Sequence, residues 1–489
     1  MSLTASGTPR LYGALAGLLT IFVFACLATC SGPSNEPEAP KRVILITVDT
    51  LRADHMSVYG YPRQTSPALD ELARQGVTFT SAVAQWPKTG PSLASIFTGR
   101  YPKTTGLTHR AAQRIPDEYR TLPELFQSAG YRTLGVVSNA VLSAELGWNR
   151  GFDEFLETWK QGGAVSEDPV EHRKWVTAPL VNRLAIPALD RHADAERLFV
   201  WLHYSDPHAP YLLPEGAEDP FIDDDFDTQD ELIEQELPPS RAIQDERRLG
   251  FFVARYDANI LVTDTHIGAI LDHLEGLGLL DDAMVIFTSD HGEGLGEHDE
   301  LFEHGREPYN TTAHVPLLIT RSGVARASRQ VEHPIELLDL YPTLLDTLQI
   351  PHGDEGLEGS SLVPFLGPMG AVETEALKPF RYAFSEAGGG QQLWRHYKSV
   401  QDGRWKLVFH PAVERGGRRL PATFELYDLE SDPAETENLA GRREEEFDRL
   451  WKELSAWMES TPEVGQTDSE SEAYSEETLN ALRALGYID

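Results

Sequence analysis

The sequence predicts an α/β fold: a doubly wound, largely parallel sheet flanked by helices, with a smaller C-terminal α+β subdomain that carries an antiparallel sheet. First, the nearly continuous apolar run 43–48 suits a buried strand of a parallel sheet. Second, further strand-like runs alternate with helical patterns up to about residue 375. Third, the character changes after Glu375, where a strand at 405–409 precedes a final helix at 444–458.

The elements between these points follow from local signals. A helix is expected from Ser66-Pro67 to Gln75, because serine suits an N-cap, proline suits the first turn and Gly76 ends the pattern. The other expected elements are a helix at 121–130, strands at 131–137 and 198–204, a long helix at 249–274 and a strand at 284–288. In doubly wound sheets, ligands bind outside the carboxyl ends of the strands.

Composition divides the chain into four predicted segments. These are a signal or lipoprotein segment at 1–30, a tether at 31–40, a catalytic α/β domain at 41–375, and a C-terminal subdomain with an acidic tail at 376–489. An acidic insertion is expected at about 215–247. Its part 215–236 has no basic residue, which favours a solvated surface insertion over a calcium site.

The N-terminus predicts export. Arg10 is the only charge before the apolar stretch 14–27, as in a secretory signal. The following Leu27-Ala28-Thr29-Cys30 resembles a bacterial lipobox, so we expect a lipoprotein anchored to a membrane through Cys30, in the periplasm or cell envelope. An ordinary cleaved signal and an uncleaved anchor are the alternatives. Both cysteines lie in this segment, so the folded domain has no disulfide, thiolate zinc site or cysteine nucleophile.

The charge of the chain limits its partners. A formal net charge of −35 repels nucleic acid, so a nucleic-acid partner is not expected. An anionic substrate would need a local cluster of positive charge or a metal ion to bind such a protein.

The ends of three predicted strands carry polar residues. They are Asp49, the segment 203–208 (His-Tyr-Ser-Asp-Pro-His), and the segment 289–293 (Ser-Asp-His-Gly-Glu). Asp49, Asp290 and His291 are oxygen and nitrogen donors suited to a divalent cation. A helix cap or a hydrogen-bonded surface histidine would be the alternative for each residue alone.

Thr89 adds a hydroxyl group near the start of a helix that we expect to begin at about Pro91. A side chain there would face backbone N–H groups and the positive end of the helix dipole, which together stabilise an anion. A metal ion bound to the hydroxyl would also lower its pKa and make it a nucleophile. A plain N-cap threonine is the alternative.

An ordered series of motifs carries a family resemblance. VILITVDTLRADHMSVYGY contains Asp49, TGPSLASIFTGRYP contains Thr89, WLHYSDPHAPY contains His208, and VIFTSDHGEGLGEH contains Asp290 and His291. VEHPIELLDLYPTLLDTLQIP, GLEGSSLVPFL, LYDLESDPAETENLA and LRALGYID follow. In this order they resemble the sulfatase family of the alkaline phosphatase superfamily.

The resemblance implies a metal site and a nucleophile. Asp49, Asp290 and His291, with Thr89, would bind one divalent metal ion. The donor set leaves calcium, magnesium, manganese and zinc open. Thr89 would occupy the position of the nucleophile.

The resemblance also implies roles around the substrate. His208 would contact the anionic head of the substrate or protonate the leaving group. His304 lies about where the family carries a charged lysine, which makes it a catalytic candidate. Asn139 and Arg52 are candidate substrate-binding residues, although a structural ion pair is an equal alternative for Arg52.

The chain departs from the family at several positions. The family converts a cysteine or serine to formylglycine where this chain has Thr89, so no formylglycine is expected. Leu93 replaces an arginine, Thr50 replaces the second aspartate, and Ser138-Asn139 replaces a Lys-Trp-His segment. What remains is a metal–hydroxyl core that resembles the phosphoryl-transferring members of the superfamily.

The leading hypothesis is a metal-dependent sulfatase-family hydrolase that cleaves a sulfate or a phosphate/phosphonate ester through a covalent intermediate at Thr89. The substrate would be an anionic ester: a glycan, a lipid headgroup or a small molecule. Alternatives are a phosphoethanolamine-type headgroup transferase and a non-catalytic glycan-binding lipoprotein with a degenerate site. The sequence leaves open the oligomeric state and a second metal ion.

Overall fold

A computed structural model describes residues 39–108, 113–161, 177–222, 231–238, 240–322, 328–351, 356–367, 378–388, 396–415, 418–460 and 475–484. The predicted signal segment, including Cys30, lies outside the described residues. So do most of the predicted tether and the boundary at 375–376, and these divisions of the chain stay predictions.

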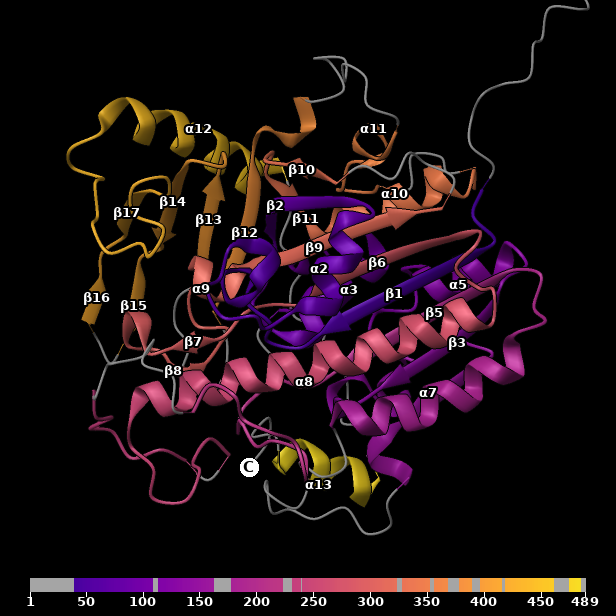
Figure 1. Ribbon diagram of the computed structural model, residues 1–489. Coiled ribbons are helices and arrows are strands. Elements are labelled where there is room, and N and C mark those ends of the chain that lie inside the picture. Colours follow the sequence, from indigo (N-terminus) through magenta and orange to yellow (C-terminus); the bar gives the residue numbers. More distant parts are fainter. Residues whose placement is uncertain are drawn as a thin grey trace, which may run out of the picture. The chain divides into compact units, whose positions relative to one another are not determined.

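The predicted α/β fold is confirmed. The central sheet has nine strands within the described residues, in the order β10-β2-β9-β6-β1-β5-β3-β4, with β11 also paired to β2 (Figure 1). Their bounds are β1 Arg42–Val48, β2 Val77–Val83, β3 Arg132–Val137, β4 Glu154–Glu157, β5 Leu198–Tyr204, β6 Ala283–Ser289, β9 His314–Arg321, β10 Arg329–Val331 and β11 Ile335–Glu336. All neighbours are parallel except β9, which runs antiparallel to β2 and β6.

Strand β1 lies in the middle of the parallel part because both of its faces are apolar. Val43 and Leu45 pack into one hydrophobic core, and Ile44 and Ile46 pack into the other. All four side chains are fully buried. Strands β5 and β6 pair with β1 in parallel on its two sides, so the carboxyl ends of these three strands meet at one edge.

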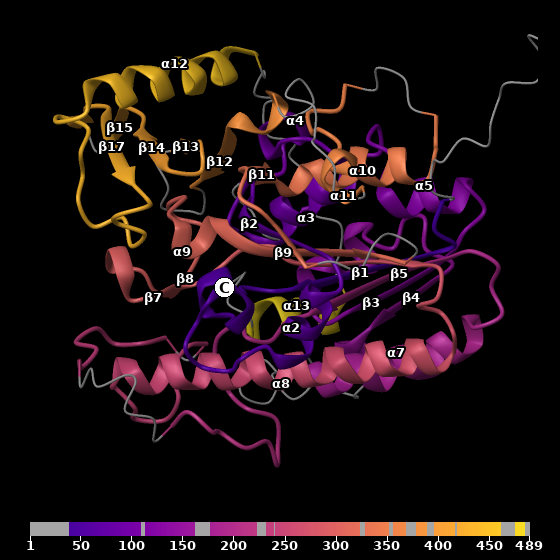
Figure 2. The same cartoon turned by 45° about the horizontal axis from the view of Figure 1, so that its top comes forward.

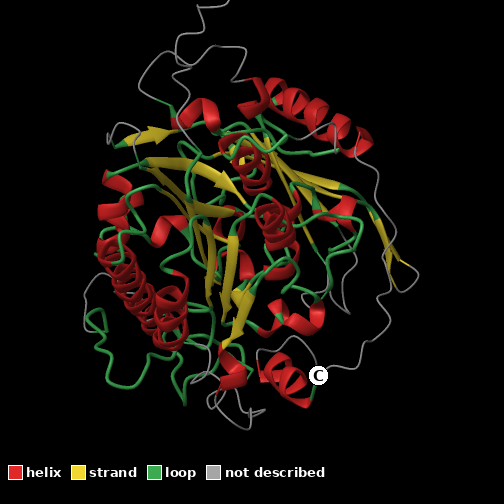
Figure 3. Cartoon of the chain, turned by 90° about the vertical axis from the view of Figure 1, so that its right-hand side faces the viewer, coloured by secondary structure: helices red, strands yellow, loops and turns green. Residues whose placement is uncertain are grey.

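Helices cover both faces of the sheet (Figures 2 and 3). α2, α7 and α8 contribute side chains to the core on one face, while α3, α5 and α10 contribute to the core on the other. The bounds are α2 Pro67–Arg74, α3 Thr89–Thr98, α4 Pro102–Thr105, α5 Leu122–Ser128, α7 Ala178–His192, α8 Leu249–Gly276, α9 Asn310–Ala313, α10 Leu340–Thr347 and α11 Val363–Leu366. None of the described helices combines the length and the apolar character needed to cross a membrane.

The C-terminal region carries the predicted antiparallel sheet. Strands β12 Ala383–Ala387, β13 Tyr397–Gln401, β14 Trp405–His410 and β17 Thr423–Asp428 form it in that order, and α12 Glu444–Ser460 packs against it. Two short antiparallel pairs are β7 Gly294–Leu295 with β8 Leu301–Glu303, and β15 Val413–Arg415 with β16 Arg418–Leu420. A last helix, α13 Glu476–Ala484, contributes Ala481 and Leu482 to a core of the central sheet.

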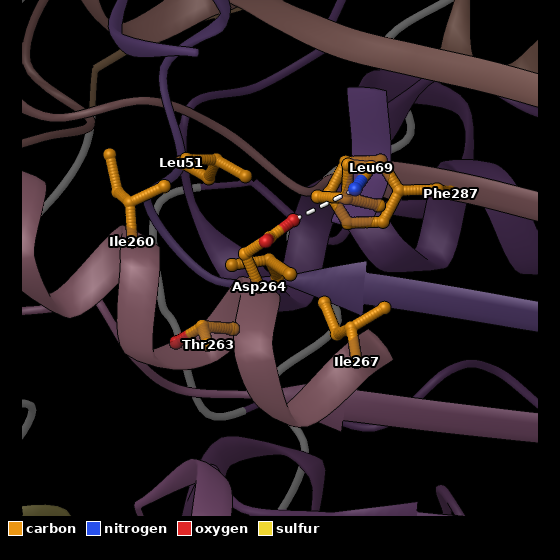
Figure 4. A pocket seen from close by; sticks show the side chains of 8 residues that line it. Leu51, Leu69, Ile260, Thr263, Asp264, Ile267 and Phe287 are labelled. Atoms are coloured by element: carbon orange, nitrogen blue, oxygen red, sulfur yellow. Dashed lines mark hydrogen bonds between the residues drawn. The ribbon is translucent and has the colours of Figure 1, made fainter. Parts of the chain in front are cut away.

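A small apolar pocket between β1, α2 and α8 has a structural role. Figure 4 shows Leu51, Leu69, Ile260, Ile267 and Phe287 around the side chain of Asp264. The Asp264 carboxylate accepts hydrogen bonds from the backbone N–H groups of Ala68, at 2.8 Å, and Leu69, at 2.9 Å. A carboxylate of α8 therefore satisfies the first turn of α2, which has no side-chain bond from its own N-cap residue.

Candidate active site

Asp49 and Asp290 come together because their strands are neighbours. Val48 of β1 is paired with Ser289 of β6, and Asp49 and Asp290 are the residues that directly follow this pair. The backbone also ties the two turns, since the N–H of Asp290 donates to the carbonyl of Val48 at 3.3 Å. Both aspartates are fully buried. The two carboxylates therefore lie together at one edge of the sheet, as predicted.

Thr89 lies at the first position of α3 and not before it. The expectation that the helix begins at about Pro91 was wrong: α3 begins at Thr89, and Lys88 is the N-cap residue. The Thr89 hydroxyl therefore does not cap the helix. Its Oγ1 lies 3.5 Å from Oδ1 of Asp49 and 3.3 Å from Nε2 of His291. The plain N-cap interpretation of Thr89 is thus excluded by its position and contacts.

His291 completes the set predicted from the motifs. Its Nδ1 donates to the backbone carbonyl of Gly292 at 2.9 Å, so the lone pair of the neutral ring is on Nε2. Nε2 lies 3.6 Å from Oδ1 of Asp49 and 3.7 Å from Oδ2 of Asp290. Burial is the main cause that lowers the pKa of His291, which favours the neutral ring that a metal ion binds.

His203 is a site residue that we did not predict as a ligand. Its side chain, with Asp49 and Asp290, offers ligand atoms that all lie within 4.8 Å of one another. His203 Nδ1 lies 2.9 Å from the hydroxyl of Thr47, and its buried Nε2 has no hydrogen-bond partner among the described residues. Burial, with the neighbouring His291 and His208, lowers its pKa to about 3, so the ring is neutral. A polar residue inside the otherwise apolar run of β5 was the available signal.

The donors in this cluster fit a divalent cation. Burial, followed by the charge of Asp290, raises the pKa of Asp49 well above its ordinary value. Burial raises the pKa of Asp290 to about 7, and its Oδ2 has no hydrogen-bond partner among the described residues. Two buried carboxylates side by side are costly unless positive charge compensates them. Imidazole nitrogen and carboxylate oxygen are accepted by several divalent ions, so the donor set does not select one.

Two neighbouring side chains position the carboxylates. Asn139 donates from Nδ2 to Oδ2 of Asp49 at 2.7 Å and accepts the N–H of Val141 through Oδ1, at 3.1 Å. These bonds aim the other Asp49 oxygen at Thr89 and His291. The Ser92 hydroxyl of α3 donates to the backbone carbonyl of Asp290 at 2.6 Å. The contacts of Asn139 thus favour a role in orienting Asp49 over the predicted contact with substrate.

His304 and His208 lie beside this cluster. The His304 ring centroid is 4.3 Å from that of His291 and 5.3 Å from that of His208. Nδ1 of His304 lies 3.0 Å from a carboxylate oxygen of Glu293, and Nδ1 of His208 lies 2.7 Å from the carbonyl of Ala209. Both predicted catalytic histidines are therefore next to the cluster around Thr89.

Arg52 has structural partners. Its guanidinium contacts both carboxylate oxygens of Asp54, at 2.9 and 2.7 Å, and Glu297 at 2.9 Å. It also donates to the backbone carbonyl of Glu293 at 3.2 Å. These contacts favour the ion-pair alternative, and substrate binding by Arg52 stays a prediction without a supporting contact.

Comparisons with known proteins agree with this arrangement. Residues 41–350 match the profile of the family described as Sulfatase, and residues 296–463 match that described as N-sulphoglucosamine sulphohydrolase, C-terminal. An ulvan-active sulfatase of Formosa agariphila is 29% identical over 86% of this chain and 81% of its own. An N-acetylglucosamine-6-O-sulfatase of Bacteroides thetaiotaomicron is 25% identical over 89% and 88%. The structure of a phosphonate monoester hydrolase from Silicibacter pomeroyi is similar with a TM-score of 0.64 and 22% identity, over 87% and 96%.

Fold, site and comparisons together define a hydrolase of the alkaline phosphatase superfamily. Within that class the chain belongs to the sulfatase family, whose profile covers most of its length. The predicted resemblance is therefore confirmed, and the enzyme acts on sulfuric or phosphoric ester bonds as a sulfatase-like hydrolase.

Proposed function

We propose that this hydrolase cleaves phosphate or phosphonate monoesters, and sulfate esters less readily, with the Thr89 hydroxyl as nucleophile. One observation carries the proposal: Thr89 Oγ1 lies 3.5 Å from a carboxylate oxygen and 3.3 Å from a neutral imidazole nitrogen of the candidate metal cluster. A hydroxyl that only stabilised its helix would bond to the backbone of the first turn instead.

The residues divide the reaction into two displacements. A neighbouring imidazole takes the hydroxyl proton as Thr89 Oγ1 attacks phosphorus. The bond to the ester oxygen then breaks, and the departing oxygen receives a proton through Nε2 of His208 or His304. Water then attacks the phosphothreonine, which releases phosphate and restores the hydroxyl. The N-terminal N–H groups of α3 face the anion. Asp49, Asp290, His291 and His203 would hold a divalent cation, which lowers the pKa of a bound hydroxyl and neutralises charge when present.

The preference for phosphorus esters follows from the side chain at position 89. Threonine cannot become the formylglycine that the family uses on sulfate esters. A sulfated threonine would be a simple sulfate ester, and such esters resist attack. The likeness in fold to a phosphonate monoester hydrolase supports a phosphorus substrate. Sulfatase relatives whose names include sugars support a glycan as its carrier.

The test is to identify the covalent intermediate. The protein is quenched during turnover of an aryl phosphate and, separately, an aryl sulfate, and its peptides are analysed by mass spectrometry. We expect a phosphoryl group on Thr89, and Thr89→Ala to lower turnover at least about a thousandfold. Thr98→Ala is the matched control, because it lies in the same helix and its buried hydroxyl donates only to the carbonyl of Ala94, at 2.7 Å.

Other results would favour the alternatives. Full activity of Thr89→Ala would remove Thr89 as the nucleophile. Turnover that needs an added acceptor alcohol would identify a headgroup transferase. Tight binding of esters with no turnover of any of them would identify a non-catalytic binding protein.

We also propose that the enzyme is exported and held at a membrane by a lipid on Cys30. The apolar stretch that ends in Leu27-Ala28-Thr29-Cys30 supports this location. Cys30→Ser should release the protein from the membrane fraction and abolish labelling by a fatty acid. Cys26→Ser, in the same stretch, should do neither. Membrane association that survives Cys30→Ser would instead favour an uncleaved anchor.

A further inference from the structure

Two cations that the motifs did not indicate converge on the segment 303–305, beside His304. Lys88 precedes Thr89, and its side chain lies across Gly305: a Cβ atom on Gly305 would be 2.3 Å from Cε of Lys88. Gly305 has a φ of +88°, so glycine here gives both the backbone conformation and the room for the lysine. The lysine stem is thereby directed past His304.

The second cation comes from the acidic insertion. Arg241 lies in the segment between β5 and α8, and its guanidinium forms an ion pair with the carboxylate of Glu303. Burial lowers the pKa of Lys88, and the carboxylate of Glu303 opposes this effect and favours the charged ammonium group. The insertion predicted as a solvated surface feature therefore brings a cation to the edge of the site.

Chain geometry places both cations beside the site residues. Lys88 is the residue before Thr89, and the two residues that the cations contact, Gly305 and Glu303, flank His304 in the sequence. The order outward from the reacting hydroxyl is thus Thr89, His291, His304, and then the group formed by Lys88, Arg241 and Glu303.

This group suits a ligand better than a structural role. Lys88 and the side chains of Arg241 and Glu303 are partly exposed, the latter two at 27% and 34%. Ion pairs with such exposure add little to stability. One carboxylate faces two cations, so the three side chains sum to a positive charge in a chain whose net charge is −35.

We propose that Lys88 and Arg241 form an anion subsite that binds a second negatively charged group of the substrate, beyond the ester that is cleaved. The substrate class is then an ester that carries a further carboxylate, sulfate or phosphate group, as an acidic glycan does. Glu303 is the counter-ion of both cations and keeps them at a distance from the reacting centre. This inference rests on the proposed function, since it places the scissile ester at Thr89.

The experiment measures binding separately from turnover. Phenyl phosphate and carboxyphenyl phosphate are titrated by calorimetry into the Thr89→Ala protein with a divalent metal present. We expect tighter binding of the carboxylated ester. This preference should fall about fivefold with Lys88→Met or Arg241→Gln, the change expected from one partly exposed ion pair. Methionine keeps the stem packed on Gly305. Arg248→Gln, in the same segment, removes a cation that pairs with Glu246 and should keep the preference.

Glu303→Gln gives a result in the opposite direction. It removes the competing carboxylate, so the preference for the carboxylated ester should increase. Equal binding of the two esters, or a preference that falls with Glu303→Gln, would overturn the subsite. If the wild-type enzyme turns over no ester and the binding preference still follows these variants, the nucleophile proposal fails while the subsite stands.

Discussion

Asp264 and Asp290 are two buried carboxylates whose pKa burial raises to about 7, yet their surroundings differ. Asp264 satisfies two backbone N–H groups of α2 in an apolar pocket (Figure 4). Asp290 accepts N–H groups only through Oδ1, and its Oδ2 faces His291 at 3.7 Å. A raised pKa is therefore common to both residues and does not separate them. The distinction is that both oxygens of Asp264 accept hydrogen bonds, whereas one oxygen of Asp290 is left to bind a ligand.

The largest expected effect comes from neutralising Asp290, with the same change at Asp264 as the comparison. Asp290→Asn should lower turnover about a thousandfold, the loss expected when several kcal/mol of charge stabilisation are removed. It should also abolish the rise in melting temperature that added divalent metal gives the wild type. Asp264→Asn should keep the metal-dependent rise and most of the turnover. If both variants lost turnover equally, the distinction between the two carboxylates would be wrong.

A smaller effect is expected where Asn139 supports Asp49. Asn139→Ala removes the N–H donor 2.7 Å from Oδ2 of Asp49, so metal affinity should fall about 10- to 100-fold. Calorimetric titration with the metal ion alone measures this. Asn182→Ala is the control, because this buried amide bonds to Tyr204 and the His266 carbonyl. It should lower the melting temperature and leave metal affinity intact. Unchanged affinity in Asn139→Ala would assign that residue to substrate contact.

The smallest effect concerns pH and Asp264. Its folded-state pKa of about 7 lies above the ordinary value, so between about pH 4 and 7 the folded state binds more protons than the unfolded state. Its contribution to stability is full below this range and is lost as the pH rises through it. Relative to Asp264→Asn, metal-free wild type should lose at least about 1 kcal/mol between pH 5 and 8. Urea unfolding measures the difference, and parallel curves would contradict it.

The sequence predicted the parts of the fold that depend on local patterns. The apolar run of β5 matches its predicted range, and α8 begins where its helical pattern begins, at Leu249. Strand β9 was not predicted, and its Pro316 argues locally against a central strand. The structure accommodates this proline where the register of β2 shifts between Phe79 and Ala82, and the Thr288 hydroxyl donates a hydrogen bond to the carbonyl of Pro316. This irregularity lies in β2, far from Pro316 in the sequence, so no local pattern around the proline predicts it.

The sequence predicted the site residues that lie at strand ends within motifs. It did not predict residues whose roles depend on contacts between distant segments. Asp49, Asp290 and His291 lie together as expected from neighbouring strands. His203 was noted in the polar segment 203–208 but not predicted as a ligand, because that role depends on which strand ends lie beside it in the sheet. The partners of Asn139 depend in the same way on contacts between distant segments.

The hydrogen bond from Ser92 to the Asp290 carbonyl has a consequence for motion. It joins the first turn of the helix that carries Thr89 to the strand end that carries the carboxylate. We expect thermal displacements of the two elements to be correlated, so that the Thr89 hydroxyl and the Asp290 carboxylate shift together. For the proposed nucleophile, this coupling would keep the oxygen aligned with the carboxylate between substrate encounters.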